Sequence, residues 1–455
     1  MFTTIKKIHF VGIGGIGMSG IAEILLNQGF EITGSDVQRG ENIKYLEKKG
    51  IKIFIGHKSS NIGGAEVVVY SSAVNPLSNP ETVAATQLNI PIIRRAEMLA
   101  EAARLNYCLA VAGTHGKTTT TSIVALIMIR AGFDPTVIVG GRLKDFGGTN
   151  ARLGKGDWTV VEADEYDRSF LQLSPTIAVI NNIELEHIDI YADLDDIKAT
   201  FTEFANKVPF YGLVALGMDD IGVKDIMTNI NKNIVTFGLS KHADVRATDV
   251  KHDKTRTTCN VVENGVILGE LVVNIAGLHN LKNALAATAV ARRLGIDFPT
   301  ICSAIADFKG VYRRFDIKGE KHGVLVVDDY AHHPTEVEAA LDAAQNGFNR
   351  RVVCVFQPHT YSRTKELCHD FGSAFDNADL LIVTDVYPAR ELPIEGVTGR
   401  IIADAVTERG HKSVTYMPEL DAAYSYVKRI LREGDLLITL GAGNVCDIAE
   451  RFMKD

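Results

Sequence analysis

The sequence predicts an α/β protein of three domains, each built around a mostly parallel sheet covered by helices. Three observations carry this prediction. The chain has 455 residues, more than a single hydrophobic core usually holds. Strand-like apolar runs alternate with helix-like runs along it, which is typical of a doubly wound sheet. At two places a strand-like run leads through a glycine-rich loop into a helix-like run. We place the domains at residues 1–106, 107–316 and 317–455.

The composition is that of an ordinary globular protein. Hydrophobic residues make up 46% of the chain and charged residues 23%, and the formal net charge is −8. This acidic balance argues against a nucleic-acid or anionic-membrane partner. The six cysteines are scattered without C-x-x-C spacing, which indicates a reducing compartment. No apolar run is long enough to span a membrane, so we expect a cytoplasmic protein and leave a weak homodimer open.

The first domain carries the first glycine loop. Strands are expected at Ile8–Val11, Glu31–Thr33 and Glu66–Tyr70, with helices at Ile16–Asn27 and Asn42–Lys49. Gly12-Ile-Gly-Gly-Ile-Gly17 satisfies G-x-G-x-x-G, and Asp36 follows the next strand, as in Rossmann-like domains. The motif alone says only that an anion can approach a helix N-terminus. Asp36 could instead merely end its strand and cap a turn.

The second glycine loop is more specific and opens the central domain. Gly113-Thr-His-Gly-Lys-Thr-Thr119 lies between the apolar run Tyr107–Val111 and a helix-like run that continues to Ile129. Backbone amides, the Lys117 ammonium and the first hydroxyl, Thr118, then face a triphosphate and its Mg²⁺. The full Walker pattern requires glycine where this chain has Val111. A chance Gly-Lys-Thr remains the alternative, but the strand and helix context favours a P-loop ATPase-type domain.

Further strands and helices complete the second and third domains. In the central domain we expect strands at Trp158–Glu162, Ile177–Asn181 and Val266–Val273 and helices at Asn280–Leu294 and Pro299–Phe308. In the third, Rossmann-like domain we expect strands at Gly323–Val327, Arg351–Phe356, Leu380–Thr384 and Leu436–Leu440.

Three carboxylates directly follow the strand that ends at Val161. Mg²⁺ prefers a few carboxylate or hydroxyl oxygens, and ligands bind at the carboxyl ends of parallel strands. Glu162 is the best metal ligand because it comes first after the strand. Asp164 and Glu165 could instead form a solvated turn, the commoner fate of acidic clusters.

Six motifs in order resemble the Mur ligase family, whose members join amino acids to a nucleotide-linked sugar acid. They cover nearly the whole chain: Val11–Glu23, Gly113–Thr119, Asn181–Asp189, Leu278–Ala284, Asp328–Glu336 and Phe356–Thr364. The first and the last two of these are similar to the branch that adds L-alanine to UDP-N-acetylmuramate. The resemblance implies ATP as co-substrate, two Mg²⁺ ions and an amide formed through an acyl phosphate, in peptidoglycan precursor synthesis.

The resemblance also assigns roles to residues. Those expected at ATP are Gly113, Thr114, His115, Gly116, Lys117, Thr118, Thr119, His279, Asn280, Asn283 and Arg314, with Arg313 beside the last. Those expected at the UDP-sugar are Gly14, Gly15, Gly17, Asp36, Ser71 and Ser72. The metal ligands would be Thr118, Glu162 and His187, and the catalytic set Lys117, Glu162, His187, His359 and Arg363. For His115 the backbone amide matters more than the ring.

Some of these positions depart from the family pattern or have another reading. Glu186 stands where the family has Asp, and Thr360 stands where some relatives have a second Arg beside Arg363. Asn280 could be an N-cap, and a metal site at His332-His333 is disfavoured because adjacent side chains point apart.

Three other functions compete with the alanine ligase. A related ligase attaches a whole recycled peptide to the same sugar nucleotide. A nicotinamide oxidoreductase rests on the first glycine loop and Asp36 alone, and leaves residues 113–119 unexplained. A regulatory ATPase or sugar-nucleotide sensor would use both loops but form no amide. The sequence does not decide whether a lysine is carbamylated, or whether glycine or serine replaces alanine.

Overall fold

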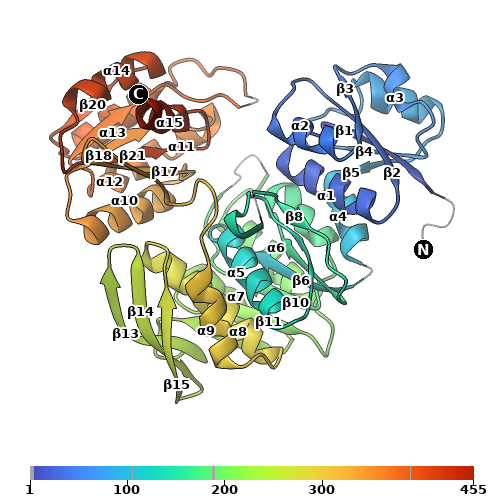
Figure 1. Ribbon diagram of the computed structural model, residues 1–455, viewed down its shortest axis with the longest axis horizontal. Helices are drawn as coiled ribbons and strands as arrows, with labels where there is room; N and C mark the ends of the chain where they lie inside the picture. Colours follow the sequence, from blue (N-terminus) through green and yellow to red (C-terminus); the bar gives the residue numbers. More distant parts are fainter. Residues whose placement is uncertain (1–4, 105, 147, 187–189, 390) are drawn as a thin grey trace. The chain divides into compact units, whose positions relative to one another are not determined.

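The computed structural model describes the whole chain apart from residues 1–4, 105, 147, 187–189 and 390. It contains three separate sheets of five, ten and six strands, and the three-domain α/β fold class is confirmed (Figure 1). By internal contacts the chain divides into two compact units. The first comprises Met1–Asp249, Asn260–Leu271 and Lys282–Phe308, and the second comprises Val250–Cys259, Val272–Leu281 and Lys309–Asp455. The limits at 106 and 316 stay a prediction.

The five-stranded sheet is parallel and has the order β3-β2-β1-β4-β5. Its strands are β1 (Lys7–Val11), β2 (Glu31–Asp36), β3 (Lys52–Ile55), β4 (Val67–Tyr70) and β5 (Ile92–Arg94). The helices are α1 (Ile16–Asn27), α2 (Glu41–Lys48), α3 (Pro80–Gln87) and α4 (Arg95–Ala103), with the short helix η1 at Ser59–Ile62. The strand order reverses between β1 and β4, and a ligand crevice is expected at the carboxyl ends of such strands.

The ten-stranded sheet has the order β15-β14-β13-β12-β11-β10-β6-β9-β7-β8. Its strands are β6 (Tyr107–Ala112), β7 (Thr136–Ile138), β8 (Ala151–Arg152), β9 (Trp158–Glu162), β10 (Ile177–Ile180), β11 (Leu213–Gly217), β12 (Ile234–Gly238), β13 (Val245–Asp253), β14 (Arg256–Glu263) and β15 (Val266–Val273). Its helices are α5 (Lys117–Arg130), α6 (Leu194–Asn206), α7 (Ile221–Met227), α8 (Leu278–Arg293) and α9 (Phe298–Asp307), with η2 at Lys144–Phe146 and η3 at Tyr166–Gln172. The central strands β9, β6, β10 and β11 run parallel, so their carboxyl ends share one edge.

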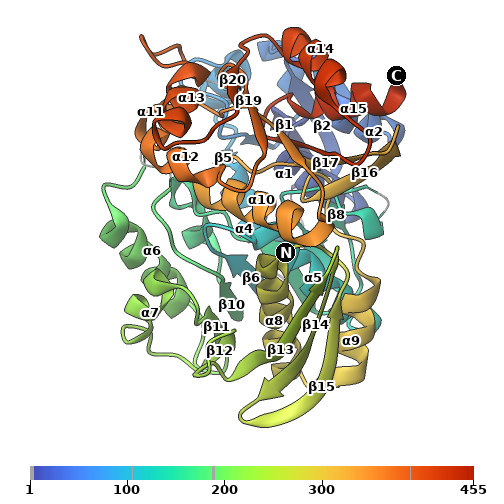
Figure 2. The same cartoon turned by 90° about the vertical axis from the view of Figure 1, so that its left-hand side faces the viewer.

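The six-stranded sheet has the order β16-β17-β21-β18-β19-β20, and only β16 runs antiparallel to its neighbour. Its strands are β16 (Asp316–Lys321), β17 (Val324–Asp329), β18 (Val352–Phe356), β19 (Leu380–Val383), β20 (Val414–Tyr416) and β21 (Leu436–Leu440). Its helices are α10 (Pro334–Phe348), α11 (Tyr361–Glu366), α12 (Cys368–Ala374), α13 (Gly399–Glu408), α14 (Leu420–Ile430) and α15 (Cys446–Lys454), seen from a second side in Figure 2.

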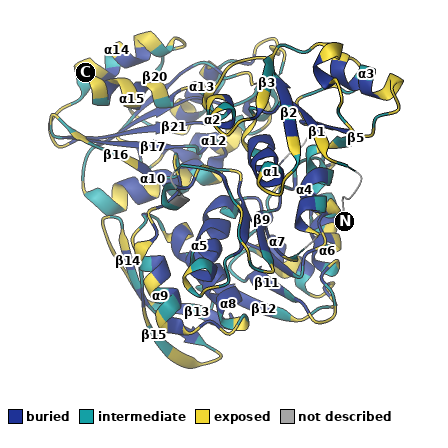
Figure 3. Ribbon diagram, turned by 45° about the vertical axis from the view of Figure 1, so that its right-hand side comes forward, coloured by how far each residue is buried: buried dark blue, intermediate teal, exposed yellow. Residues whose placement is uncertain are grey.

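Apolar strands explain why these sheets are buried on both faces. Val352, Val353, Cys354, Val355 and Phe356 of β18 are all completely inaccessible, although alternate residues of a strand point to opposite faces. One set of them packs in a cluster with α10, α12 and α13, and the other set packs with α14 and α15. Figure 3 shows the same pattern of buried strands elsewhere in the chain. Among the helices of the described residues, none has the length and apolar character to cross a membrane.

Candidate active site

The second glycine loop lies between β6 and α5, as the sequence predicts, and it wraps around the Lys117 ammonium. Lys117 Nζ donates to the carbonyl oxygens of Gly113 (2.7 Å) and Thr114 (3.0 Å) and to Glu165 Oε1 (2.8 Å). Gly113 and Gly116 have φ of +132° and +78°, conformations that favour glycine. The loop therefore needs its glycines for its backbone path, and it holds a cation at the start of α5.

Lys117 keeps its charge although it is buried. Burial alone would lower the pKa of this ammonium. The negative charges of Glu165, Asp164 and Glu186 outweigh burial and raise the pKa of Lys117 above its ordinary value. Glu165 is 2% exposed, so the alternative that it belongs to a solvated turn is wrong. Asp164 is more open and pairs with Arg95 at 3.4 Å.

Thr118 and Glu162 bring two oxygen ligands together at the N-terminus of α5. Glu162 ends β9, which pairs with β6 so that Glu162 lies beside Val111. The Thr118 hydroxyl donates to Glu162 Oε2 at 2.9 Å, and the Gly140 amide donates to the same oxygen at 2.7 Å. Burial raises the pKa of Glu162 above its usual value. A hydroxyl and a carboxylate at a phosphate loop fit the oxygen chemistry that Mg²⁺ prefers.

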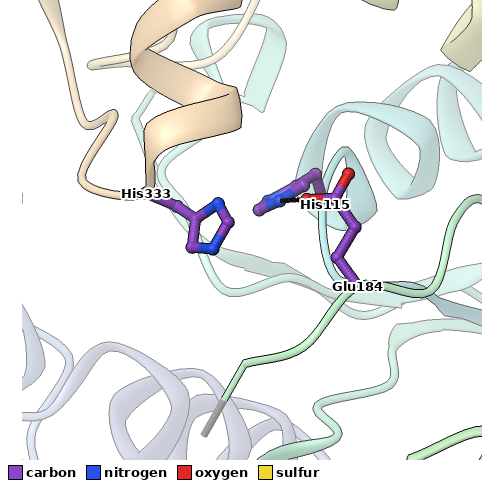
Figure 4. Close-up of side chains that lie close together, drawn as sticks. All are labelled: His115, Glu184 and His333. Carbon is purple, nitrogen blue, oxygen red and sulfur yellow. Dashed lines mark hydrogen bonds and ion pairs between the residues drawn. The ribbon is translucent and has the colours of Figure 1, made fainter. Parts of the chain in front are cut away.

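Residues after β10 line the other side of this loop. Asn182 Oδ1 accepts the His115 amide at 2.7 Å, and the His115 ring lies 3.3 Å from Glu184 Oε2 (Figure 4). Asn181 Nδ2 donates to the Thr120 hydroxyl at 3.1 Å. The predicted ligand His187 lies outside the described residues. Asn181, Asn182 and Glu184 were not singled out from the sequence, although they begin the motif that contains His187.

Helix α8 supplies Asn283, which the structure places at the loop. Asn283 Oδ1 accepts the Thr120 hydroxyl at 3.2 Å, and a Cβ on Gly116 would lie 2.4 Å from it. Helix α8 begins at Leu278, so Asn280 lies inside its first turn and the N-cap alternative is wrong. Asn280 Nδ2 donates to the Ala276 carbonyl oxygen at 2.6 Å. Asn280 and His279 belong to the second compact unit, and their contact with ATP stays a prediction.

The first glycine loop follows β1 and is held by the end of β2. The Gly14 amide donates to Asp36 Oδ2 at 2.9 Å, so Asp36 holds the glycine loop and does more than end its strand. Its contact with the UDP-sugar stays a prediction. A Cβ at Gly14 would meet this carboxylate at 2.9 Å, and one at Gly17 would meet Arg95 Nη1 at 2.9 Å. Ser71 follows β4 and is buried, with Ser72 exposed beside it. Sequence reasoning missed Arg95, a cation at the loop that stands at the start of α4.

The second compact unit carries a cluster of rings at the carboxyl end of β18. Arg363 Nη1 lies 3.4 Å from His359 Nδ1, and the His359 ring stacks on Tyr387 at 5.9 Å and meets His332 edge-on at 5.5 Å. Burial, followed by the charges of His332 and Arg363, lowers the pKa of His359 to about 3. His359 is therefore neutral at physiological pH, while Arg363 keeps a guanidinium that can pair with a carboxylate.

Arg313 and Arg314 lie just before β16 and are paired within this unit. Arg313 Nε lies 3.1 Å from Asp328 Oδ2, and Arg314 Nη1 lies 3.2 Å from Glu336 Oε1. Glu336 also accepts the His332 amide at 3.1 Å. The predicted reach of Arg314 to the ATP phosphates stays a prediction.

Comparison with known proteins agrees with this geometry. Three domains built on mostly parallel sheets and a lysine-bearing glycine loop at a helix N-terminus define a nucleotide-binding α/β protein. Three family models match in order: "Mur ligase family, catalytic domain" at residues 7–107, "Mur ligase middle domain" at 111–291 and "Mur ligase, glutamate ligase domain" at 313–443. This chain belongs to the Mur ligase family.

Two curated relatives carry the same name within that family, and two solved structures carry names that differ from each other. The UDP-N-acetylmuramate–L-alanine ligase of Geobacter sp. (strain M21) is 53% identical over 100% of this chain and 98% of its own length. The enzyme of the same name from Salinibacter ruber is 49% identical over 99% of this chain and 95% of its own. The crystal structure of UDP-N-acetylmuramate-alanine ligase from Thermotoga maritima superposes with a TM-score of 0.85 at 31% identity, covering 98% of each chain. A murein peptide ligase from Psychrobacter arcticus has a TM-score of 0.74 at 25% identity, covering 99% of this chain and 98% of its own.

Proposed function

We propose that this chain joins L-alanine to the lactyl carboxylate of UDP-N-acetylmuramate at the expense of ATP, in peptidoglycan precursor synthesis. The observation that carries the proposal is the 53% identity over the full chain to a ligase named for these substrates. The Lys117 loop and the His359–Arg363 pair supply the chemistry the reaction needs. In this proposal residues 1–106 bind the UDP-sugar, 107–316 bind ATP and 317–455 bind the amino acid.

In the first step a lactyl carboxylate oxygen attacks the γ-phosphorus of ATP. The bond from phosphorus to the ADP oxygen breaks, and an acyl phosphate forms. The Lys117 ammonium and the amides at the start of α5 hold the phosphate charge, so catalysis here is mainly positioning and electrostatics. Mg²⁺, when bound, neutralises charge on the phosphates, and Thr118 and Glu162 are the residues that would hold it, with His187 proposed for a second ion.

In the second step the alanine amine attacks the acyl carbon. The carbon–oxygen bond to phosphate breaks, phosphate leaves, and the amine nitrogen loses its proton to solvent. Arg363 binds the alanine carboxylate as a fixed guanidinium. With a pKa of about 3, His359 is a weak base, so we assign it to positioning the amino acid rather than to removing the proton.

We place this activity in the cytoplasm. Each of the six cysteines is a free thiol in the structure, which agrees with a reducing compartment.

The test is phosphate release from ATP in the presence of UDP-N-acetylmuramate and one amine at a time. L-alanine, glycine, L-serine and an alanine-headed tripeptide are compared, and the amide is identified by mass. We expect release that requires both the sugar nucleotide and L-alanine. Preference for the tripeptide would instead assign the chain to the peptide-recycling ligases, which the likeness to the murein peptide ligase makes the alternative. Release that ignores every amine would contradict a ligase.

A further inference from the structure

Beneath the first glycine loop lies a buried polar cluster around Glu81, which is outside every motif of the sequence. Glu81 sits in the first turn of α3 and its side chain is completely inaccessible. Its Oε2 accepts the Ser35 hydroxyl at 2.5 Å and lies 3.3 Å from His57 Nδ1 and 3.6 Å from His9 Nε2. Its Oε1 accepts the Asn61 amide at 2.5 Å.

The Glu81 carboxylate is ionised in this buried position. Burial alone would raise its pKa, but the interactions with His9, Ser35 and Asn61 outweigh burial and lower the pKa to about 2. A buried charge costs several kcal/mol unless its surroundings are built to hold it. Strongly shifted pKa values of this kind cluster at functional sites.

One route from Glu81 leads to the glycine loop through Ser35. The Ser35 side chain binds Glu81, while its carbonyl oxygen accepts the amides of Gly12 at 2.8 Å and Ile13 at 3.0 Å. Holding the Ser35 side chain in place therefore also holds the carbonyl oxygen that accepts the amides at the start of the loop.

A second route leads through Asn61 to Asp36. Asn61 Nδ2 donates to Gly56 O at 3.0 Å as well as to Glu81, and the Gly56 amide donates to Asp36 O at 2.8 Å. The Asp36 carboxylate in turn holds the Gly14 amide. The backbone of Gly12–Gly14, the first half of the loop, thus depends on residues that Glu81 binds.

We infer that Glu81 is a positioning residue for the UDP-sugar site: through Ser35 and Asn61 its carboxylate sets the backbone path of Gly12–Gly14, which leads into the N-terminus of α1. This inference rests on the proposed function, because it takes the first glycine loop as the place where the UDP pyrophosphate binds. Glu81 acts through these residues and not by contact with the substrate. Backbone amides bind a pyrophosphate only where they are held in the right direction, and displacements near 1 Å are enough to weaken such sites strongly.

The experiment measures KM for each substrate in Glu81→Gln, which keeps the shape of the side chain but removes its charge. We expect the KM for UDP-N-acetylmuramate to rise about ten-fold or more, while the KM values for ATP and L-alanine change less than about two-fold. Ser35→Ala removes only one hydroxyl and is expected to raise the same KM about three-fold or more. It serves as the test if Glu81→Gln does not fold.

Glu66→Gln is the matched control. Glu66 also holds β1, by accepting the amides of Lys6 at 2.5 Å and Lys7 at 2.9 Å, but it is exposed and lies at the opposite end of the strand. It should leave all three KM values unchanged. Equal KM values in Glu81→Gln and wild type, or a uniform rise for all substrates, would overturn the inference. Failure of the wild-type protein to turn over UDP-N-acetylmuramate at all would instead overturn the proposed function.

Discussion

Lys117 is the residue whose removal tests the nucleotide site most directly. Lys117→Met keeps a long apolar stem and removes only the ammonium. The three N–H donors of that ammonium bind the carbonyl oxygens of Gly113 and Thr114 and the Glu165 carboxylate. If the Lys117 charge stabilises the transferring phosphoryl group in the transition state, its loss lowers turnover at least ~10²-fold, which is about 2.7 kcal/mol of activation free energy. The loss should appear mainly in kcat, since an interaction made only in the transition state lowers kcat and kcat/KM together.

The same substitution also perturbs folding, because it breaks a buried ion pair. The Glu165 side chain is 3% exposed and would lose its cation. Removing one partner of a buried pair typically costs about 3–5 kcal/mol, because the other charge stays buried. The double variant Lys117→Met/Glu165→Gln removes that uncompensated charge. It should recover most of the stability and none of the turnover.

Urea unfolding and the phosphate-release assay separate the two effects. Lys428→Met is the control: Lys428 pairs with Asp455 at 3.0 Å on an exposed surface of the second unit, and neither stability nor turnover should change. Wild-type turnover in a folded Lys117→Met variant would refute the phosphate role. Recovery of turnover in the double variant would show that the single variant had only lost its fold.

Three further predictions address the loop, the amino-acid pocket and pH. Gly116→Ala should abolish ATP binding in a titration, because the new Cβ would lie 2.4 Å from Asn283 Oδ1 at a residue whose φ is +78°. Gly132→Ala is the control: φ is +84° there, but the new Cβ meets nothing within 4 Å. The control should only lower the free energy of unfolding, by about 1–2 kcal/mol. Arg363→Lys should raise the KM for alanine about ten-fold or more without changing that for ATP, because an ammonium cannot bind a carboxylate in bidentate fashion; an unchanged alanine KM would remove Arg363 from the pocket. Burial raises the pKa of Asp329 from 3.8 to about 6, so its contribution to stability is present at low pH and is lost as pH rises through about 6. Between pH 4 and pH 7 the free energy of unfolding of the wild type, measured in urea, should therefore fall by up to about 3 kcal/mol relative to that of Asp329→Asn. The same pH dependence in both proteins would contradict the raised pKa.

Local patterns in the sequence were enough to find the elements that carry the two loops. The apolar run before Gly113 and the Lys-Thr start of the helix are adjacent in the chain, and the structure places β6 and α5 there. The order of the strands within a sheet could not be predicted from such local patterns. Glu162 lies beside Val111 because β9 pairs with β6, and that pairing joins residues about fifty positions apart, which no local period reveals.

The residues that sequence reasoning missed share this dependence on distant segments. Arg95 reaches Gly17 only because α4 packs against α1. Glu81 looks in the sequence like an ordinary acid in the first turn of a helix, where the dipole favours one. Its burial against Ser35 and Asn61 comes from β2 and η1, elements on other parts of the chain. The sequence could not decide whether Glu165 lies at the site or in a solvated turn, because its partner, Lys117, lies on another element.

Both glycine loops have an acidic side chain at the groups that would meet phosphate, and this has a consequence for binding. Glu165 holds the Lys117 ammonium and Asp36 holds the Gly14 amide. Buried donors need acceptors, so these carboxylates keep the loops in shape. A phosphate oxygen brings the same negative charge to the same donor, and like charges repel. At the proposed sites, a phosphate that binds these donors therefore competes with a carboxylate rather than simply adding a contact. The affinity at each loop then depends on the difference between two similar interactions, and on whether the carboxylate keeps the loop in the shape that receives the phosphate.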